Sequence, residues 1–349
     1  MKISFVIPVY NCKDYLPACV DSIRAVGAED YEILLIDDGS TDGSGAVCDE
    51  LAERFPEIRV VHQANAGASA ARNRGLAEAQ GELLLFIDAD DSIDSAALGK
   101  VLSDPRCMES DLTIFGLTFD YYHNGKRYRR DPMYYDYNGV MNRDDWGRNF
   151  VQLYLDNSLS PVWNKVFKRE ILQANGLLLD TSMFLYEDFE FVLRYMRHCD
   201  TIWNVPQAIY HYRQSEDEGN AGRRLKRIDS IPDFLKPIEA SLSALPESVS
   251  GEDKAMVLQQ LHLVLAREKI AVSDVPTIRS VCADYRKWSE NRVLPMKQDQ
   301  FQASLLEGRA HLLYLKNKKS QLRHWVAVRA KATLMLIRKQ SNYADKVRE

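Results

Sequence analysis

A chain of 349 residues that is 46% hydrophobic and 27% charged has the composition of an ordinary globular protein, which excludes a disordered or fibrous chain. Its length favours one large domain with a smaller appendage. The formal charge of −5 combines +9 on residues 309–349 with −14 on residues 1–308, which argues against a general nucleic-acid-binding protein and predicts a local anionic partner for the basic tail.

The first 120 residues alternate short β-rich runs with helical patterns, as is typical of a mostly parallel sheet covered by helices. Strands are predicted at residues 3–9, 32–37, 58–62, 82–87 and 112–119. Helices are predicted between them at residues 14–24, 44–54, 68–78 and 95–102. Ligands of such sheets bind beyond the carboxyl ends of the strands, so we expect the chemistry in the residues that follow each strand.

The next hundred residues are less regular. Residues 120–140, rich in Tyr and interrupted by Gly, predict a hairpin or a mobile loop. Further elements are predicted in order: a helix at 144–155, an apolar run at 163–167, a helix at 187–197, and a strand pair near 201–204 and 208–212. The polar stretch 214–224 then separates this body from purely helical patterns that break near Pro246, Pro276 and Pro295.

We therefore predict a main domain at residues 1–220, with halves at 1–120 and 121–220, followed by a helical region at 221–349. The six scattered cysteines form no C-x-x-C pair, so we expect reduced thiols in a cytoplasmic protein and no structural metal site built from them. No apolar run approaches the roughly 20 residues of a membrane helix. The run 3–10 is too short for a signal peptide and contains Pro8, so it is predicted to be a first buried strand.

Two predicted strands run directly into acidic residues. The first of these strands ends at Asp37 and is followed by Asp38 and Asp42, and the second is followed by Asp88, Asp90 and Asp91. Carboxylates at neighbouring strand ends repel one another unless cations or donor groups compensate, so the pattern predicts a site for Mg²⁺ or Mn²⁺ together with a nucleotide. The alternative is that Asp37, Asp38 and Asp88 form turns or cap helices.

Six motifs follow one another along residues 1–215. They are I-S-F-V-I-P-V-Y-N at 3–11, D-D-G-S-T-D at 37–42, N-A-G at 65–67 leading to A-R-N at 71–73, D-A-D-D at 88–91, W-N-K-V-F at 163–167 and E-D-F-E-F at 187–191. In this order and spacing they resemble the motifs of the family 2 glycosyltransferases, which have the GT-A fold. The resemblance does not extend to the C-terminal third.

The resemblance implies an α/β fold in which helices flank a Rossmann-like, mostly parallel sheet, with a C-terminal helical extension. It also implies the inverting transfer of a sugar from a nucleotide diphosphate donor, expected to be a UDP-hexose or UDP-N-acetylhexosamine, to an acceptor hydroxyl. The acceptor would be a saccharide or lipid-linked saccharide in the assembly of a bacterial surface polysaccharide such as capsule, exopolysaccharide or O-antigen.

The resemblance places the nucleotide base at the end of the first strand. Tyr10 would stack on the base, while Pro8, Val9 and Asn11 belong to the loop that shapes this site. Asp38 would accept a hydrogen bond from the N3–H group of uracil. Alternatively, Tyr10 is a core aromatic residue.

Further along the chain, the resemblance assigns six residues to the ribose, the phosphates and the metal: Asn65, Gly67, Arg72, Asp88, Ala89 and Asp90. Arg72 suits bidentate contacts with anions, although a solvated helix residue is its alternative. Asp88 would reach the ribose, and Asp90 would bind the Mn²⁺ or Mg²⁺ that neutralises the departing diphosphate.

Three further positions flank this donor site. Asp91 supports the metal site or caps the next helix, and His211 is a candidate further metal or phosphate contact, as is Arg213. A lone histidine among strand aromatics is more often structural.

An inverting transfer requires one general base, and the resemblance assigns this role to Asp188, with Glu187 as the fallback. The alternative is that both acids merely favour the N-terminus of a helix. Trp163 and Lys165 are predicted to form part of the acceptor-binding platform, because aromatic faces stack on sugar C–H surfaces; a buried structural Trp is the alternative.

Two rival functions are less consistent with these residues. A sugar nucleotidyltransferase also uses acidic metal ligands, but it carries a Gly-rich phosphate loop after the first strand, and residues 8–14 contain no glycine. A noncatalytic sugar-nucleotide sensor or assembly subunit would be favoured by the loss of Asp90 or Asp188, and both are present.

The basic tail carries 11 Lys or Arg residues against Asp345 and Glu349. Its apolar residues, among them Trp325 and Leu336, can form a loose apolar face with cationic flanks, as in interfacial helices. We therefore predict peripheral attachment to the anionic inner face of the cell membrane. The alternative is a helix that packs on the catalytic domain or pairs two subunits of a homodimer.

Overall fold

The computed structural model describes residues 3–123, 125–215, 227–271, 275–290, 292, 294–296 and 300–307. Contacts within the chain divide it into two compact units. The first comprises Met1–Glu218 and Pro237–Lys254, and the second comprises Gly219–Lys236 and Ala255–Glu349. The chain therefore leaves the first unit after its last strand and re-enters it for a short segment.

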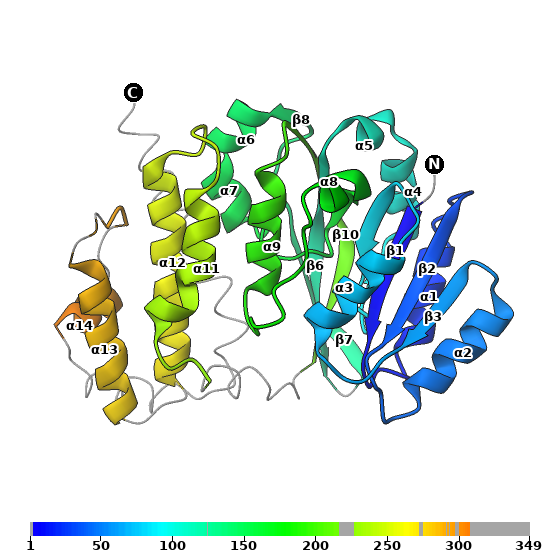
Figure 1. The fold of residues 1–349 in the computed structure, drawn as a ribbon, viewed down its shortest axis with the longest axis horizontal. Coiled ribbons are helices and arrows are strands. Elements are labelled where there is room, and N and C mark those ends of the chain that lie inside the picture. Colours follow the sequence, from blue (N-terminus) through cyan, green and yellow to red (C-terminus); the bar gives the residue numbers. More distant parts are fainter. Residues whose placement is uncertain are drawn as a thin grey trace. The chain divides into compact units, whose positions relative to one another are not determined.

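The first unit contains a ten-stranded sheet with the order β3-β2-β1-β4-β9-β6-β10-β5, in which β7 also pairs with β6 and β8 with β10 (Figure 1). The strands are β1 (Ile3–Val9), β2 (Tyr31–Asp37), β3 (Ile58–His62), β4 (Leu83–Phe86), β5 (Ser92–Ile93), β6 (Leu112–His123), β7 (Lys126–Met133), β8 (Gly139–Asn142), β9 (Lys165–Lys168) and β10 (Thr201–Ser215). Strands β3, β2, β1 and β4 run parallel, as do β6 and β10. The remaining pairs are antiparallel.

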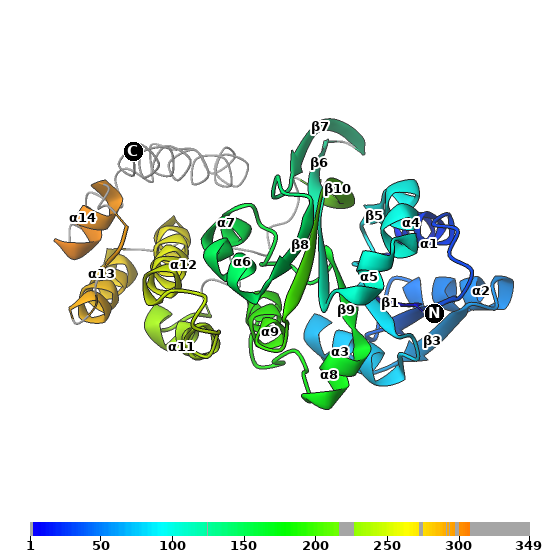
Figure 2. The same cartoon turned by 90° about the horizontal axis from the view of Figure 1, so that it is seen from above.

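Helices flank both faces of the sheet. They are α1 (Leu16–Arg24), α2 (Ser44–Arg54), α3 (Ala68–Glu78), α4 (Ser95–Ser103), α5 (Pro105–Glu109), α6 (Arg143–Arg148), α7 (Phe150–Leu155), α8 (Arg169–Ala174) and α9 (Glu187–Met196). Phe5 and Ile7 of β1 belong to the core cluster that includes α1, α2 and α4. Val6, on the other face of the same strand, touches Gly75 of α3 so closely that an added Cβ at Gly75 would lie 2.1 Å from Val6 Cγ1. Figure 2 accordingly shows α1 and α4 on one side of the strands and α3 on the other.

The predicted α/β fold with flanking helices is confirmed, with corrections in the second hundred residues. The sheet is mixed, because β9 inserts antiparallel between β4 and β6. The tyrosine-rich segment forms the hairpin option, since β6 and β7 pair antiparallel. The predicted helix at 144–155 is two helices, α6 and α7, which meet at Asn149. The predicted strand pair is the single strand β10, whose register is interrupted near Ala208.

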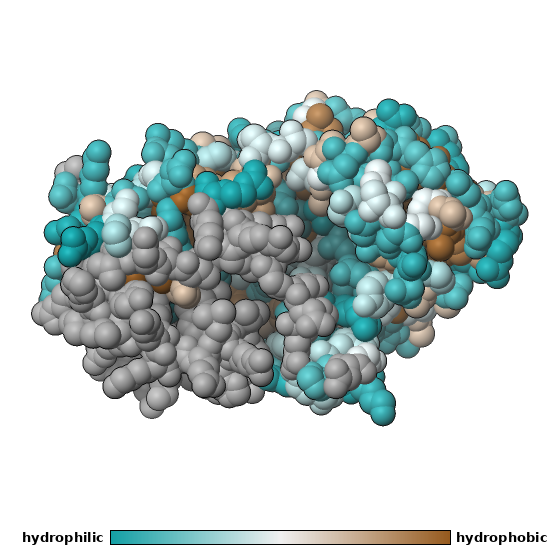
Figure 3. Space-filling model, turned by 90° about the horizontal axis from the view of Figure 1, so that it is seen from below, coloured by the Kyte–Doolittle hydropathy of each residue, from teal (hydrophilic) through white to brown (hydrophobic). Residues whose placement is uncertain are grey.

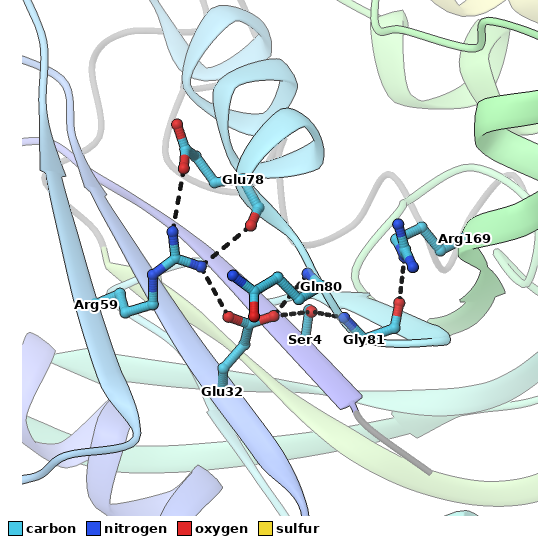
Figure 4. A network of polar contacts seen from close by, with 7 residues as sticks. All are labelled: Ser4, Glu32, Arg59, Glu78, Gln80, Gly81 and Arg169. Carbon is cyan, nitrogen blue, oxygen red and sulfur yellow. Dashed lines mark hydrogen bonds and ion pairs between the residues drawn. The ribbon is translucent and has the colours of Figure 1, made fainter.

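A polar network fastens the amino ends of the parallel strands, opposite the edge where the motifs lie (Figure 4). The buried carboxylate of Glu32 accepts from Ser4 Oγ at 2.7 Å, from Gln80 N at 2.7 Å and from Arg59 Nη1 at 3.0 Å. Ser4 Oγ in turn accepts from Gly81 N at 2.8 Å. This network holds the connection from α3 to β4 against β1 and β2. It therefore fixes the relative positions of these strands, whose carboxyl ends carry the motifs.

The second unit is helical in its described part. It contains α13 (Val275–Ser289), α14 (Gln300–Leu306) and most of α12 (Gly251–Ala271). Helix α11 (Ile231–Ser243) begins in the second unit and ends in the first. Within this unit the buried ring of His262 packs against Tyr285 and Trp288 at centroid distances of 5.0 and 4.5 Å. Burial lowers the pKa of His262 to about 3, so the ring is neutral in the folded unit.

Among the described residues, no helix combines the length and apolarity needed to cross a membrane. On the face drawn in Figure 3, the residues that are not grey are mostly hydrophilic, and the hydrophobic ones lie in small separate patches. All six cysteines are buried and free.

Candidate active site

The loops that follow β1 and β2 are tied together at the carboxyl edge of the sheet. Asn11, in a left-handed conformation with φ 51°, accepts from Thr41 N at 2.8 Å through its side chain, and its own N–H donates to Ser40 Oγ at 3.2 Å. Cys12 N donates to Ser44 Oγ at 2.9 Å. These hydrogen bonds join the loops that carry the first two motifs.

Tyr10 is exposed at this edge, with 52% of its surface accessible. Pro8 before it is partly buried. Val9 is fully buried, and its carbonyl accepts from Asp38 N at 2.9 Å. The alternative that Tyr10 is a core residue is therefore wrong, and an open ring face lies where base stacking was predicted.

Asp38 is buried and organises the N-A-G turn. Its carboxylate accepts from Gln63 Nε2 at 2.7 Å, Ala66 N at 2.9 Å and Gly67 N at 2.8 Å. These bonds use three of the roughly four acceptor positions of a carboxylate, so one position remains for the predicted contact with a base.

Two glycines make this turn feasible. Gly67 precedes α3 with φ 90°. Gly39 has φ 71° and approaches the exposed Asn65 so closely that an added Cβ would lie 2.8 Å from Asn65 N. Position 39, in the loop after β2, therefore requires glycine for two reasons, its positive φ and the lack of space for a side chain.

Arg72 lies at the centre of the candidate site. Its side chain, only 6% exposed, projects from α3 and joins two carboxylates: Nη2 donates to Asp88 Oδ1 at 2.7 Å and Nη1 to Asp188 Oδ1 at 3.1 Å. Three motifs that are far apart in the chain therefore meet at one guanidinium. The alternative of a solvated helix residue is wrong for Arg72.

Asp188 occupies the first turn of α9, one-fifth exposed at its side chain. Burial raises the pKa of its carboxyl to about 6; Arg72 opposes this shift, while Glu187 and Asp88 add to it. Tyr186, two residues before Asp188, has φ 60°, an uncommon conformation for an aromatic residue and one that is often found at functional sites.

Tyr210 positions the D-A-D-D element. Its hydroxyl, fully buried, accepts from Asp88 N at 3.1 Å and donates to Asp91 Oδ2 at 2.6 Å. Asp91 Oδ1 also accepts from Arg213 N at 2.7 Å. Asp91 therefore supports this element, and the helix-capping alternative is wrong for it: the cap of α4 is Asp94, whose side chain accepts from Ala97 N.

The carboxylates of the D-A-D-D element repel one another. Burial raises the pKa of Asp91 well above its ordinary value, and the charges of Asp90 and Asp88 raise it further. Ala89 between them is buried.

Across the described ranges, no group of three or more His, Cys, Asp or Glu side chains is arranged to hold a metal ion. Mg²⁺ and Mn²⁺ bound to nucleotides generally need only one or two carboxylates, with phosphates and water completing the shell, and the residues present fit that mode.

His211 of β10 pairs with Ser92 of β5. Ser92 follows Asp90 by two residues. Its Nδ1 is 3.9 Å from Asp120 Oδ2. Burial lowers the pKa of His211, as does the charge of Arg130. A neutral imidazole can bind a metal, and the metal role of His211 stays a prediction.

The predicted acceptor residues are both buried. Trp163 stacks on Tyr210 at a centroid distance of 4.1 Å and on Tyr212 at 5.4 Å. Lys165 is 0% exposed, and its ammonium donates to the carbonyls of Ser158 and Pro161 and to Asn164 Oδ1. Lys165 thus fixes the turn that leads to Trp163, and this placement gives its predicted contact with an acceptor no support.

Sequence reasoning missed the roles of Tyr15 and Tyr122 beside Arg213. The Arg213 guanidinium lies 3.7 Å from the Tyr122 ring centroid and 4.6 Å from that of Tyr15. No spacing in the sequence indicates this arrangement, because the three residues come from α1's leading loop, β6 and β10. In the part of the chain that the structure describes, no carboxylate forms an ion pair with Arg213, which leaves its charge available for an anion.

Comparisons with known proteins define the class. The fold is that of a GT-A α/β protein. The family model described as "Glycosyl transferase family 2" matches residues 4–176. A relative in Escherichia coli, the uncharacterized glycosyltransferase YibD, is 30% identical over 276 residues, 78% of each chain. The chain belongs to glycosyl transferase family 2.

Other relatives match over less of their length. The uncharacterized glycosyltransferase EpsJ of Bacillus subtilis is 30% identical, over 61% of this chain and 61% of that protein. The poly(ribitol-phosphate) beta-glucosyltransferase of Bacillus spizizenii is 28% identical, over 91% of this chain but 49% of that protein.

Solved structures support the fold. TarS of S. aureus (residues 1–349), crystallised in complex with UDP-GlcNAc, has a TM-score of 0.60 at 17% identity, covering 91% of this chain and 89% of that one. At this identity the likeness establishes the GT-A architecture alone.

Proposed function

We propose that this chain transfers one sugar from a UDP-linked donor to an acceptor hydroxyl, with inversion at the anomeric carbon and with Asp188 as the general base. The observation that carries the proposal is the Arg72 bridge, which holds Asp188 next to the D-A-D-D element. The names of the relatives and the UDP-GlcNAc complex of TarS point to the same chemistry.

The base follows from the requirements of the reaction. A single displacement needs one group that takes the proton of the attacking hydroxyl, and a base works best when its pKa lies near the working pH. With its pKa raised to about 6, Asp188 is ionised at neutral pH yet more basic than an ordinary aspartate. Glu187 is the fallback.

The donor is assigned to the carboxyl edge. Tyr10 would stack on the base, Asp38 and the turn containing Asn65 and Gly67 would hold the uridine, and Asp88 would reach the ribose. Arg213, held between two tyrosine rings, would contact the diphosphate. Asp90 would hold Mn²⁺ or Mg²⁺, with His211 as a second candidate; when bound, this cation neutralises charge on the departing diphosphate.

The acceptor is proposed to be a saccharide or lipid-linked saccharide in bacterial surface-polysaccharide assembly, at the cytoplasmic face of the membrane. One relative is named for a poly(ribitol-phosphate) acceptor. The rival is a noncatalytic sugar-nucleotide-binding assembly subunit. Incubating the purified protein and Mn²⁺ with a panel of nucleotide sugars, and measuring released nucleotide with candidate acceptors, separates the two: a subunit that only binds releases none.

The metal assignment has its own prediction. Replacing Asp90 with Ala removes the proposed metal ligand, so we expect Mn²⁺-dependent UDP binding and transfer to fall while the fold stays intact. Isothermal titration with and without Mn²⁺ measures the first effect. Asp200→Ala, which changes an exposed aspartate paired with Arg143, is the matched control. Full Mn²⁺-dependent transfer by Asp90→Ala would exclude the assignment.

A further inference from the structure

We infer that Arg72 is the positioning residue of the proposed base: one guanidinium fixes the Asp188 carboxylate and links it to Asp88 of the donor edge. This inference rests on the proposed function, because it assigns the group that controls the proton acceptor. It differs from the predicted contact of Arg72 with ribose or phosphates, since both of its η nitrogens are engaged by carboxylates.

The geometry suits this role. A guanidinium is planar and offers its donors in a rigid fork, so its two η nitrogens set the relative positions of two acceptors. Asp88 Oδ1 lies 2.7 Å from Nη2 and Asp188 Oδ1 lies 3.1 Å from Nη1. Because the Arg72 side chain is only 6% exposed, little water screens these contacts.

The neighbouring residue strengthens the same connection. Asn73 Nδ2 donates to the carbonyl of Leu179 at 2.8 Å, and Asn73 Oδ1 accepts from Leu179 N at 2.8 Å. This reciprocal pair ties α3 to the segment that leads into α9. Arg72 and Asn73 together therefore bind one helix to the element that carries Asp188.

Among the charges around Asp188, Arg72 contributes most to stabilising its ionised form. Glu187 and Asp88 repel the ionised carboxylate, while Arg72 and the backbone N–H of Val162 favour it. Lys165 also acts on Asp188, but burial holds the pKa of its ammonium well below the ordinary value, so it is a poor substitute. Without Arg72, the proposed base would be protonated over a wider pH range.

The test compares Arg72→Met and Arg72→Lys with the wild-type chain. Carbon-13 NMR of aspartate carboxyls follows the titration of Asp188, whose signal is assigned by its loss in Asp188→Asn. The pH dependence of kcat/KM is measured in parallel. Arg74→Met is the matched control, because Arg74 lies on the same helix but is half exposed and pairs with Glu78.

In the wild type we expect activity to be lost as pH falls through about 6, where Asp188 takes up a proton. Arg72→Met should move both the Asp188 titration and the acid limb of the rate profile upward by about 1–3 pH units. Its transfer should therefore recover at alkaline pH. Arg72→Lys keeps the charge without the fork, so its titration should stay near that of the wild type while kcat falls.

The outcomes are distinguishable. An unchanged Asp188 titration in folded Arg72→Met, or a loss of transfer that is equal at every pH, overturns the inference and leaves the proposed function standing. A shifted titration in a protein that turns over no nucleotide sugar supports the electrostatic link and overturns the proposed function. If Arg72→Met does not fold, Arg72→Lys decides through kcat: a kcat equal to that of the wild type would show that the fork is dispensable and overturns the inference.

Discussion

Single carboxylates of the site differ in what compensates their charge. Asp38 is satisfied by two backbone N–H groups and an amide, which hold a turn. Asp91 is satisfied by a tyrosine hydroxyl and a backbone N–H. Asp188 instead faces a guanidinium and keeps part of its surface accessible. Of these three, Asp188 alone combines a raised pKa with room for a hydroxyl to approach.

This difference predicts a separation of binding from chemistry. Asp188→Asn keeps the shape but cannot take up the proton, so UDP binding should persist while kcat falls by roughly 10²-fold or more. Titration calorimetry and initial rates measure the two effects. Glu187→Gln tests the fallback base and should retain most activity if Asp188 is the base. An equal loss of UDP affinity in Asp188→Asn would indicate a structural or metal-shell role instead.

At the scale of elements, the contact between α3 and β1 determines where Arg72 can reach. Gly75 lies one helical turn after Arg72 and packs on Val6 with no space for a side chain. Helix propensity alone would favour Ala over Gly by about 1 kcal/mol. Packing outweighs propensity here, because a Cβ cannot share the space of a buried β1 side chain.

Gly75→Ala should therefore destabilise the protein by about 1–3 kcal/mol, as for other overpacked cores. Denaturant titration measures this change. Gly251→Ala is the control, since no atom lies within 4 Å of its added Cβ, and it should be close to neutral. Introducing Val6→Ala removes the obstructing methyls and should largely abolish the effect of Gly75→Ala. A stabilising Gly75→Ala would contradict this account of the interface.

At the scale of the whole molecule, the predicted membrane contact depends on residues 309–349, which lie outside the described residues. Their net charge of +9 still supports a proposal. Each cation near an anionic surface contributes on the order of 1 kcal/mol, so several together give reversible, salt-sensitive attachment. The full chain should sediment with anionic but not neutral vesicles, and truncation before Arg309 should abolish this.

High salt serves as the control in this experiment, because screening weakens attachment without removing the tail. If the full chain ignores anionic vesicles at low salt, or if truncation unfolds the first unit, the tail has a structural role such as packing or pairing two subunits. Melting curves of the truncated chain distinguish these results.

The sequence by itself determined the local features of this protein. Apolar runs and helical periodicity predicted β1, β3, α2 and α3 at their observed bounds, because these signals depend on neighbours along the chain. The motifs likewise located the carboxyl-edge residues. Their pairing could not be predicted in this way. Arg72 and Asp188 are 116 residues apart, and Tyr210 and Asp91 are 119 apart. Only tertiary packing decided these contacts. The same holds for the burial of Lys165 and the insertion of β9, because each depends on which segments distant in the sequence pack together in the core.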